Sequence, residues 1–213
     1  MSWFQPVWER LTEGYTNAPE LAVACIAEVE KAYGGRKRHY HNADHIQALL
    51  ALSQEYRHSL KAPLLVDFAI VYHDIVYKVM RKDNEHHSAV IAGKRLLALG
   101  MEAYEAGVVM LYIEATRHHQ IPAGLAHTED LALFLDFDMS ILGAPWDEYE
   151  AYTQKVRREY GIYPDLMYKP GRAKFLEASL AAPVIFHSPE FHLRFDAQAR
   201  NNMEKELQYL CRK

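Results

Sequence analysis

Apolar residues recur at spacings of three and four along almost the whole chain. This spacing places apolar side chains on one face of an α-helix, and no alternating or β-branched run is long enough for a strand. Glycines and prolines divide the chain into about ten segments. The dividing residues are Gly34-Gly35, Pro63, Gly100, Pro122 with Gly124, Gly143 with Pro145, Gly161 with Pro164, Pro170-Gly171, and Pro183 through Pro189. The pattern predicts an all-α protein, a compact bundle of about ten helices.

Gly143 and Pro145 illustrate the expected helix boundaries. We expect Gly143 to end one helix in a left-handed conformation and Pro145 to open the next. No segment resembles a flexible interdomain linker, and no internal repeat is found. Because 213 residues are within the range of one ordinary domain, residues 1–213 are predicted to form a single domain.

Composition narrows the classes of partner. The chain has 24 Lys+Arg against 28 Asp+Glu, so no basic field favours a nucleic-acid polymer or an anionic membrane. Cys25 and Cys211 make neither a disulfide framework nor a paired-thiol metal site, which favours a reducing cytoplasm. The first residues lack a secretory pattern, and no apolar stretch approaches ~18 residues. We therefore expect a cytoplasmic protein with no membrane partner.

The segment PLLVDFAIVYHDIVY predicts a central helix that is buried on all sides. Asp67 is its only polar interruption before His73 and Asp74. An imidazole and a carboxylate at adjacent positions can both reach one ion beside the helix. An isolated His-Asp pair is more often a capped helix end, so the rest of the chain decides between the two interpretations.

A second acid interrupts an apolar stripe in TEDLALFLDFDMSILG. Asp138 occupies the centre of this stripe, and Asp136 is rotated to nearly the opposite face. We therefore expect Asp138, and not Asp136, to point inward. A buried carboxylate is tolerated when it is paired or binds a metal, so the alternative for Asp138 is a buried salt bridge.

Two histidines begin the helix predicted in RKRHYHNADHIQALLALSQEY. His45 shares a face with apolar residues further along this helix and is expected to face inward. His41 lies four residues earlier, near the same side, and Asn42 or Asp44 can cap the helix.

Two imidazoles and two carboxylates that face inward from three helices predict a metal site. The predicted ligands are His45, His73, Asp74 and Asp138. The pattern does not distinguish Mg, Mn, Zn, Fe, Co and Ni, or one ion from two. Further candidates for a second metal or for orienting a ligand are Glu85, His118 and His119, whose alternative is a polar helix end.

The ordered pattern resembles the HD superfamily of metal-dependent phosphohydrolases. Short sequence motifs extend the resemblance to a bacterial family of predicted HD phosphohydrolases, over about residues 38–207. They are RHYHNADHI, VYHDIVY, DNEHHSA, LDFDMSILG, VRREYGIY, PGRAKFL and AQARNNMEKEL. The resemblance implies an HD-type helical domain that hydrolyses a phosphoester or phosphoanhydride bond, with Asp74 in the catalytic centre.

A more distant likeness concerns YHNADH, which is similar to the YHNxxH signature of class I cyclic-nucleotide phosphodiesterases. It implies that His41 protonates the leaving oxygen and that His45 binds metal. This chain is much shorter and lacks a recognisable purine-clamping glutamine motif, so cyclic-nucleotide specificity is not implied.

The substrate expected from these resemblances is a small phosphorylated metabolite such as a nucleotide. Arg38 and Asn42 are the candidates for binding it, and Arg38 suits a phosphate clamp because its guanidinium is a planar fork. Arg157, which Glu159 can pair, Arg172 and Arg200 are weaker candidates. The oligomeric state is left open, with a homo-oligomer as one option.

Two other functions stay open on the sequence. The first is a metal- or nucleotide-binding sensor that lacks turnover. The second is an oxygenase with a dinuclear iron HD site, which needs further histidine ligands between Asp74 and Asp138. The candidates for those ligands are His86, His87, His118 and His119.

Overall fold

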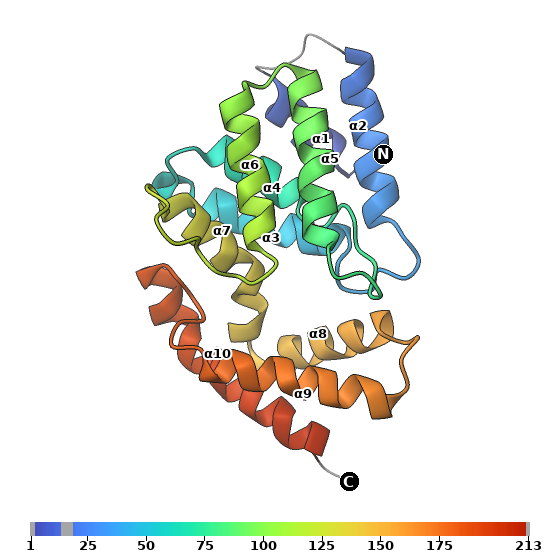
Figure 1. The fold of residues 1–213 in the computed structure, drawn as a ribbon, viewed down its shortest axis with the longest axis vertical. Coiled ribbons are helices and arrows are strands. Elements are labelled where there is room, and N and C mark those ends of the chain that lie inside the picture. Colours follow the sequence, from blue (N-terminus) through green and yellow to red (C-terminus); the bar gives the residue numbers. More distant parts are fainter. Residues whose placement is uncertain (1–2, 14–18, 212–213) are drawn as a thin grey trace. The chain divides into compact units, whose positions relative to one another are not determined.

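The computed structural model describes residues 3–13 and 19–211 (Figure 1). Within these residues the chain forms ten α-helices and two short 3-10 helices, and no strand is present. The prediction of an all-α fold with about ten helices is confirmed. The helices are α1 (Gln5–Thr12), α2 (Pro19–Tyr33), α3 (Ala43–Glu55), η1 (Arg57–Ser59), α4 (Pro63–Tyr72), α5 (Asn84–Leu99), α6 (Ala103–Ala115), α7 (Glu129–Met139), η2 (Ser140–Gly143), α8 (Trp146–Glu159), α9 (Asp165–Ala181) and α10 (Pro189–Cys211).

The chain divides into two compact units, Met1–Phe134 and Leu135–Lys213. The boundary lies within α7. Helices α1 to α6 belong to the first unit, and α8 to α10 belong to the second. That residues 1–213 form one domain stays a prediction.

Helix α4 is the centre of the first unit, as its sequence predicted. All eight residues from Leu65 to Tyr72 are buried, and α3, α5 and α6 pack around the helix. A helix that is apolar on every side loses contact with water only when neighbours surround it. Pro63 opens α4 at a position where no helical N–H is needed.

Asp67 interrupts α4 without disturbing the core, because its carboxylate is paired. Its oxygens accept hydrogen bonds from Ser53 Oγ at 2.5 Å and from an Arg57 nitrogen at 2.7 Å. Arg10 adds an ion pair at 3.6 Å. A buried charge is tolerated under these conditions.

Two boundaries differ from the sequence prediction. Helix α9 runs through Pro170-Gly171, where we expected a division. Pro170 lies inside the helix and removes the hydrogen bond that its N–H would donate to Leu166, and the buried Arg172 and Leu176 lie beyond it. Burial of these side chains in the second unit offsets the loss.

Gly143 ends η2, but the left-handed conformation expected there is absent. The glycines with positive φ in the described part of the chain are Gly100, which ends α5 at φ 98°, and Gly124. At Gly143 a Cβ would lie 2.6 Å from the Cβ of Phe195 in α10. Glycine is therefore needed here for the close approach of α10. Pro145 directly precedes α8, as predicted.

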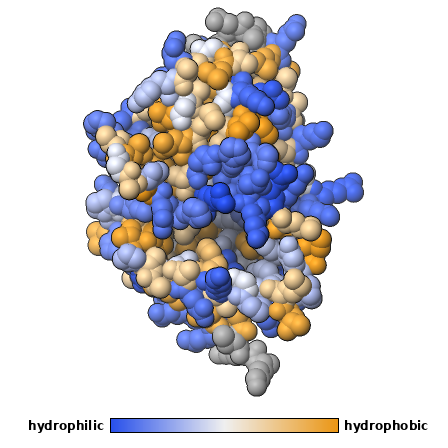
Figure 2. Space-filling view, viewed as in Figure 1, coloured by the Kyte–Doolittle hydropathy of each residue, from blue (hydrophilic) through white to orange (hydrophobic). Residues whose placement is uncertain are grey.

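No helix in the described residues is both long and apolar enough to cross a membrane. The face in Figure 2 mixes hydrophilic and hydrophobic residues.

Candidate metal centre

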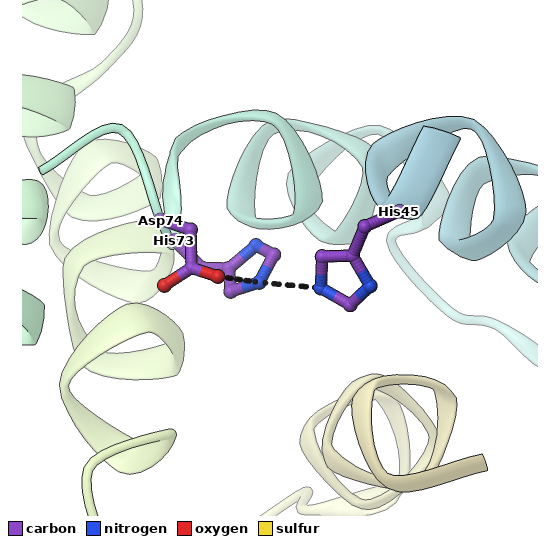
Figure 3. A group of neighbouring side chains, drawn as sticks. All are labelled: His45, His73 and Asp74. Carbon is purple, nitrogen blue, oxygen red and sulfur yellow. Dashed lines mark hydrogen bonds and ion pairs between the residues drawn. The ribbon is translucent and has the colours of Figure 1, made fainter. Parts of the chain in front are cut away.

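His45, His73 and Asp74 come together in the first unit (Figure 3). One ligand atom from each residue lies within 4.8 Å of the others. His45 comes from the first turn of α3, and His73 and Asp74 come from the end of α4. His45 and His73 are buried, and Asp74 is half-buried. The structure thus brings together three of the four ligands that the sequence predicted.

The start of α3 aims His45 into the site. Asn42 caps this helix, since its side-chain oxygen accepts the backbone N–H groups of Asp44 at 2.9 Å and of His45 at 3.4 Å. Its amide nitrogen donates to the His39 carbonyl at 3.2 Å. Asn42 rather than Asp44 is therefore the helix cap. A role for Asn42 in substrate binding stays a prediction.

The ring of His73 is oriented by the backbone of its own helix. Its Nδ1 lies 2.8 Å from the Ile70 carbonyl oxygen. Because a carbonyl only accepts, Nδ1 carries the proton and the Nε2 atom carries the lone pair. This contact could not be read from the sequence, because it uses a backbone oxygen.

The two imidazoles face each other through the atoms suited to bind a metal. His73 Nε2 lies 3.3 Å from His45 Nε2 and 3.3 Å from Asp74 Oδ2. Two imidazole nitrogens and a carboxylate oxygen suit first-row divalent metals. A ligand histidine commonly donates its other nitrogen to a carbonyl, as His73 does to Ile70. The residues present therefore fit a divalent ion.

His41 lies beside this cluster within a group of aromatic rings. Its imidazole stacks on the Tyr77 ring, with centroids 4.1 Å apart and an angle of 26°. Tyr40 contacts the His41 ring edge-on at 5.0 Å, and the His45 ring lies 5.8 Å from it. The ring stack fixes the side chain that the sequence singled out as a proton donor.

Arg38, the expected phosphate clamp, points its guanidinium at backbone carbonyls. One terminal nitrogen donates to the backbone carbonyl oxygen of Asp74 at 2.6 Å and to that of His41 at 3.2 Å. The other donates to the Ile75 oxygen at 2.9 Å. These contacts connect the backbone at His41 with the backbone at Asp74 and Ile75.

The assignment of Asp136 to an outward face was wrong. Asp136 is fully buried in the second unit, whereas Asp138 is half-buried. The two oxygens of Asp136 accept the backbone N–H groups of His187 at 2.6 Å and Ser188 at 2.7 Å. Burial raises the pKa of this carboxyl, against the effect of its hydrogen bonds. Residues on every face of α7 are buried, so the helix face on which each acid lies did not predict which of the two would be buried. Ligation by Asp138 stays a prediction.

The candidates for a second metal lie at helix ends. Glu85 is half-buried in the first turn of α5. His118 is exposed and His119 half-buried after α6, and His119 has φ 48°. The neighbouring His86 and His87 contact carboxylates, Glu114 at 2.7 Å and Asp83 at 3.1 Å respectively. None of these residues belongs to the cluster of described residues that fits an ion.

The three remaining arginine candidates have acidic partners in the second unit. Arg157 pairs with Asp165 at 2.7 Å, and Arg200 pairs with Asp196 at 2.7 Å. Arg172 is buried and pairs with Glu206 at 2.8 Å. A pocket of about 490 Å³ lies in this unit. It is lined by Trp146, Glu150, Thr153, Gln154, Arg157, Arg158, Asp165, Tyr168, Lys169, Glu206, Tyr209 and Leu210.

Comparison with protein-family models, with curated proteins and with solved structures found no match in any of the three.

Proposed function

We propose that this protein is a metal-dependent phosphohydrolase of the HD type, with its metal held by His45, His73, Asp74 and Asp138. The observation that carries the proposal is the facing pair of imidazole Nε2 atoms at 3.3 Å, with Asp74 Oδ2 beside them. The Ile70 carbonyl supports it by keeping the proton of His73 on Nδ1. The resemblance to HD phosphohydrolases supports Asp138 as the fourth ligand.

A divalent ion held by these residues would act as a Lewis acid, which would polarise a phosphoryl oxygen and lower the pKa of a water molecule. The residues of the chain divide the remaining tasks. His73 presents the lone pair of its Nε2 from a ring held by the Ile70 carbonyl, His45 faces it with its own Nε2, and Asp74 adds a carboxylate oxygen beside them. His41 holds a proton on its imidazole and transfers it to the leaving oxygen. Its stack on Tyr77 limits the ring to few orientations.

The substrate proposed is a small phosphorylated metabolite, with nucleotides as the first class to test. The near balance of acidic and basic residues argues against a nucleic-acid polymer. The use of only two cysteines supports a cytoplasmic location. Association into a homo-oligomer is left to a measurement of mass in solution.

The proposal is tested by loading metal-free protein with one ion at a time, namely Mg, Mn, Zn, Fe(II), Co or Ni. Each form is assayed for phosphate or nucleotide release from nucleoside mono-, di- and triphosphates, cyclic nucleotides and dinucleotides. We expect metal-dependent turnover that falls to background in His73→Ala and Asp74→Ala. His58→Ala is the matched control, because His58 is an exposed histidine of η1.

Circular dichroism establishes that each variant keeps its helices. Metal-dependent turnover retained in folded His73→Ala and Asp74→Ala protein would contradict the proposal. Saturable nucleotide binding without hydrolysis would favour a sensor instead. Oxygen-dependent turnover of the iron form would favour an oxygenase.

A further inference from the structure

Arg38 lies three residues before His41, ahead of α3, and its side chain reaches the residues that follow the C-terminal end of α4. Its two terminal nitrogens make three hydrogen bonds, all to carbonyl oxygens: His41 at 3.2 Å, Asp74 at 2.6 Å and Ile75 at 2.9 Å. One guanidinium thus joins the segment of the proposed acid to the segment of a proposed metal ligand.

The carbonyls that Arg38 binds need donors. Helix α4 ends at Tyr72, so the carbonyls of Asp74 and Ile75 lie beyond its last turn. Carbonyls outside a helix have no intrahelical partner, so Arg38 supplies their donors, and its positive charge also complements the negative end of the helix dipole. Without Arg38, this part of the backbone would lose the donors that fix it.

Two tyrosine rings hold the guanidinium in place. Its central carbon lies 5.0 Å from the centroid of the Tyr33 ring and 5.7 Å from that of Tyr77. Tyr33 is buried and donates from its hydroxyl to the Val71 carbonyl at 2.8 Å, which anchors it to α4. Tyr77 is also the ring on which His41 stacks. The arginine is therefore fixed on α4 and contacts the support of His41.

We propose that Arg38 is a positioning residue that sets the backbone of Asp74 and of His41, and that it does not clamp the substrate phosphate. The inference rests on the metal site of the proposed function. The three carbonyl contacts use three of the five N–H groups of the guanidinium, both of those on one terminal nitrogen and one on the other, so the two terminal nitrogens are not free to grip a phosphate together.

The first test measures metal affinity, with no substrate present. Metal-free wild-type and Arg38→Met protein are titrated with Co²⁺ and followed by the visible absorption of the bound ion. Loss of groups that orient a ligand costs about 10- to 100-fold in metal affinity, and we expect a loss of this size in Arg38→Met. Arg36→Met is the matched control, because Arg36 is an exposed arginine of the same loop and should bind Co²⁺ as the wild type does.

Two further variants separate the geometry of the guanidinium from its charge. Arg38→Lys keeps the charge but loses the planar fork, so we expect it to bind Co²⁺ more weakly than the wild type. Arg38→Ala should lose affinity and regain part of it when millimolar guanidinium is added. These variants also carry the test if Arg38→Met does not fold.

The outcomes distinguish this inference from the proposed function. Wild-type protein that binds no metal contradicts the proposed function, and the inference falls with it. If the wild type binds Co²⁺ and the Arg38 variants bind it equally well, the proposed function stands and the positioning role is overturned. A phosphate clamp would raise the inhibition constant of inorganic phosphate in Arg38→Met and leave its Co²⁺ affinity unchanged.

Discussion

His45 and His73 come from different helices, and their Nε2 atoms lie 3.3 Å apart. The proton of His73 is held on the opposite side of its ring by the Ile70 carbonyl. Asp74 adds a carboxylate oxygen 3.3 Å from His73 Nε2. An ion bound by these atoms would join the start of α3 to the end of α4, which makes metal binding a contribution to the stability of the first unit.

Metal is therefore expected to stabilise the wild-type protein against heat. A ligand present at 100 times its Kd stabilises the folded state by about 2.7 kcal/mol, which corresponds to a rise in Tm of roughly 5 to 10 °C. Differential scanning calorimetry of metal-free and metal-loaded protein measures the change. His45→Ala should show no rise and His58→Ala the full rise. An equal rise in His45→Ala would place the ion elsewhere.

Asp138→Asn is expected to weaken metal binding without unfolding the protein. An amide lacks the negative charge of a carboxylate, and we expect the affinity to fall by at least about tenfold. Isothermal titration of metal-free protein measures the affinity, and circular dichroism checks the helices. Unchanged affinity would remove Asp138 from the ligand set and leave His45, His73 and Asp74.

Asp136→Ala is expected to destabilise the second unit and to leave metal affinity unchanged. The change removes the acceptors of the His187 and Ser188 N–H groups, and each buried donor left without a partner costs about 1 to 3 kcal/mol. Urea denaturation measures the loss. If Asp136→Ala lost metal binding with its stability intact, the roles assigned to the two aspartates would be reversed.

The contribution of Asp136 should also depend on pH. Because burial raises its pKa in the folded protein, the folded state holds this proton more tightly than the unfolded chain does. The difference in unfolding free energy between wild type and Asp136→Ala is therefore largest below the unfolded pKa of about 3.9. It should decrease as the pH rises through the folded pKa. An increase over the same range would mean that the hydrogen bonds outweigh burial.

Gly143→Ala tests the close approach of α10. The new Cβ would lie 2.6 Å from the Cβ of Phe195, so the helices must separate, at a cost of about 1 to 3 kcal/mol. Gly171→Ala is the matched control in α9, where a Cβ meets nothing within 4 Å. That change should stabilise the protein by about 0.5 to 1 kcal/mol, because alanine favours helix over glycine. Equal urea midpoints for the two variants would contradict the packing argument.

Local patterns in the sequence predicted much of this protein. The spacing of apolar residues predicted an all-α fold, and the unbroken apolar run before His73 predicted that α4 would be buried on all sides. The position of His45 among apolar residues predicted that it would face inward. These predictions held because helix periodicity and burial depend on residues three and four apart, which the sequence contains directly.

The tertiary structure decided the features that depend on distant partners. Asp136 is buried because residues 187 and 188 supply it with N–H donors, and Gly143 is required because Phe195 approaches it. The guanidinium of Arg38 lies on the carbonyls of Asp74 and Ile75, residues that are far from it in the chain. Local sequence patterns do not indicate contacts between residues that are far apart in the chain. They do not indicate contacts with backbone oxygens either, because every residue has one. The sequence alone therefore determined the helices and the residue types proposed as ligands, while the long-range contacts decided which side chains meet.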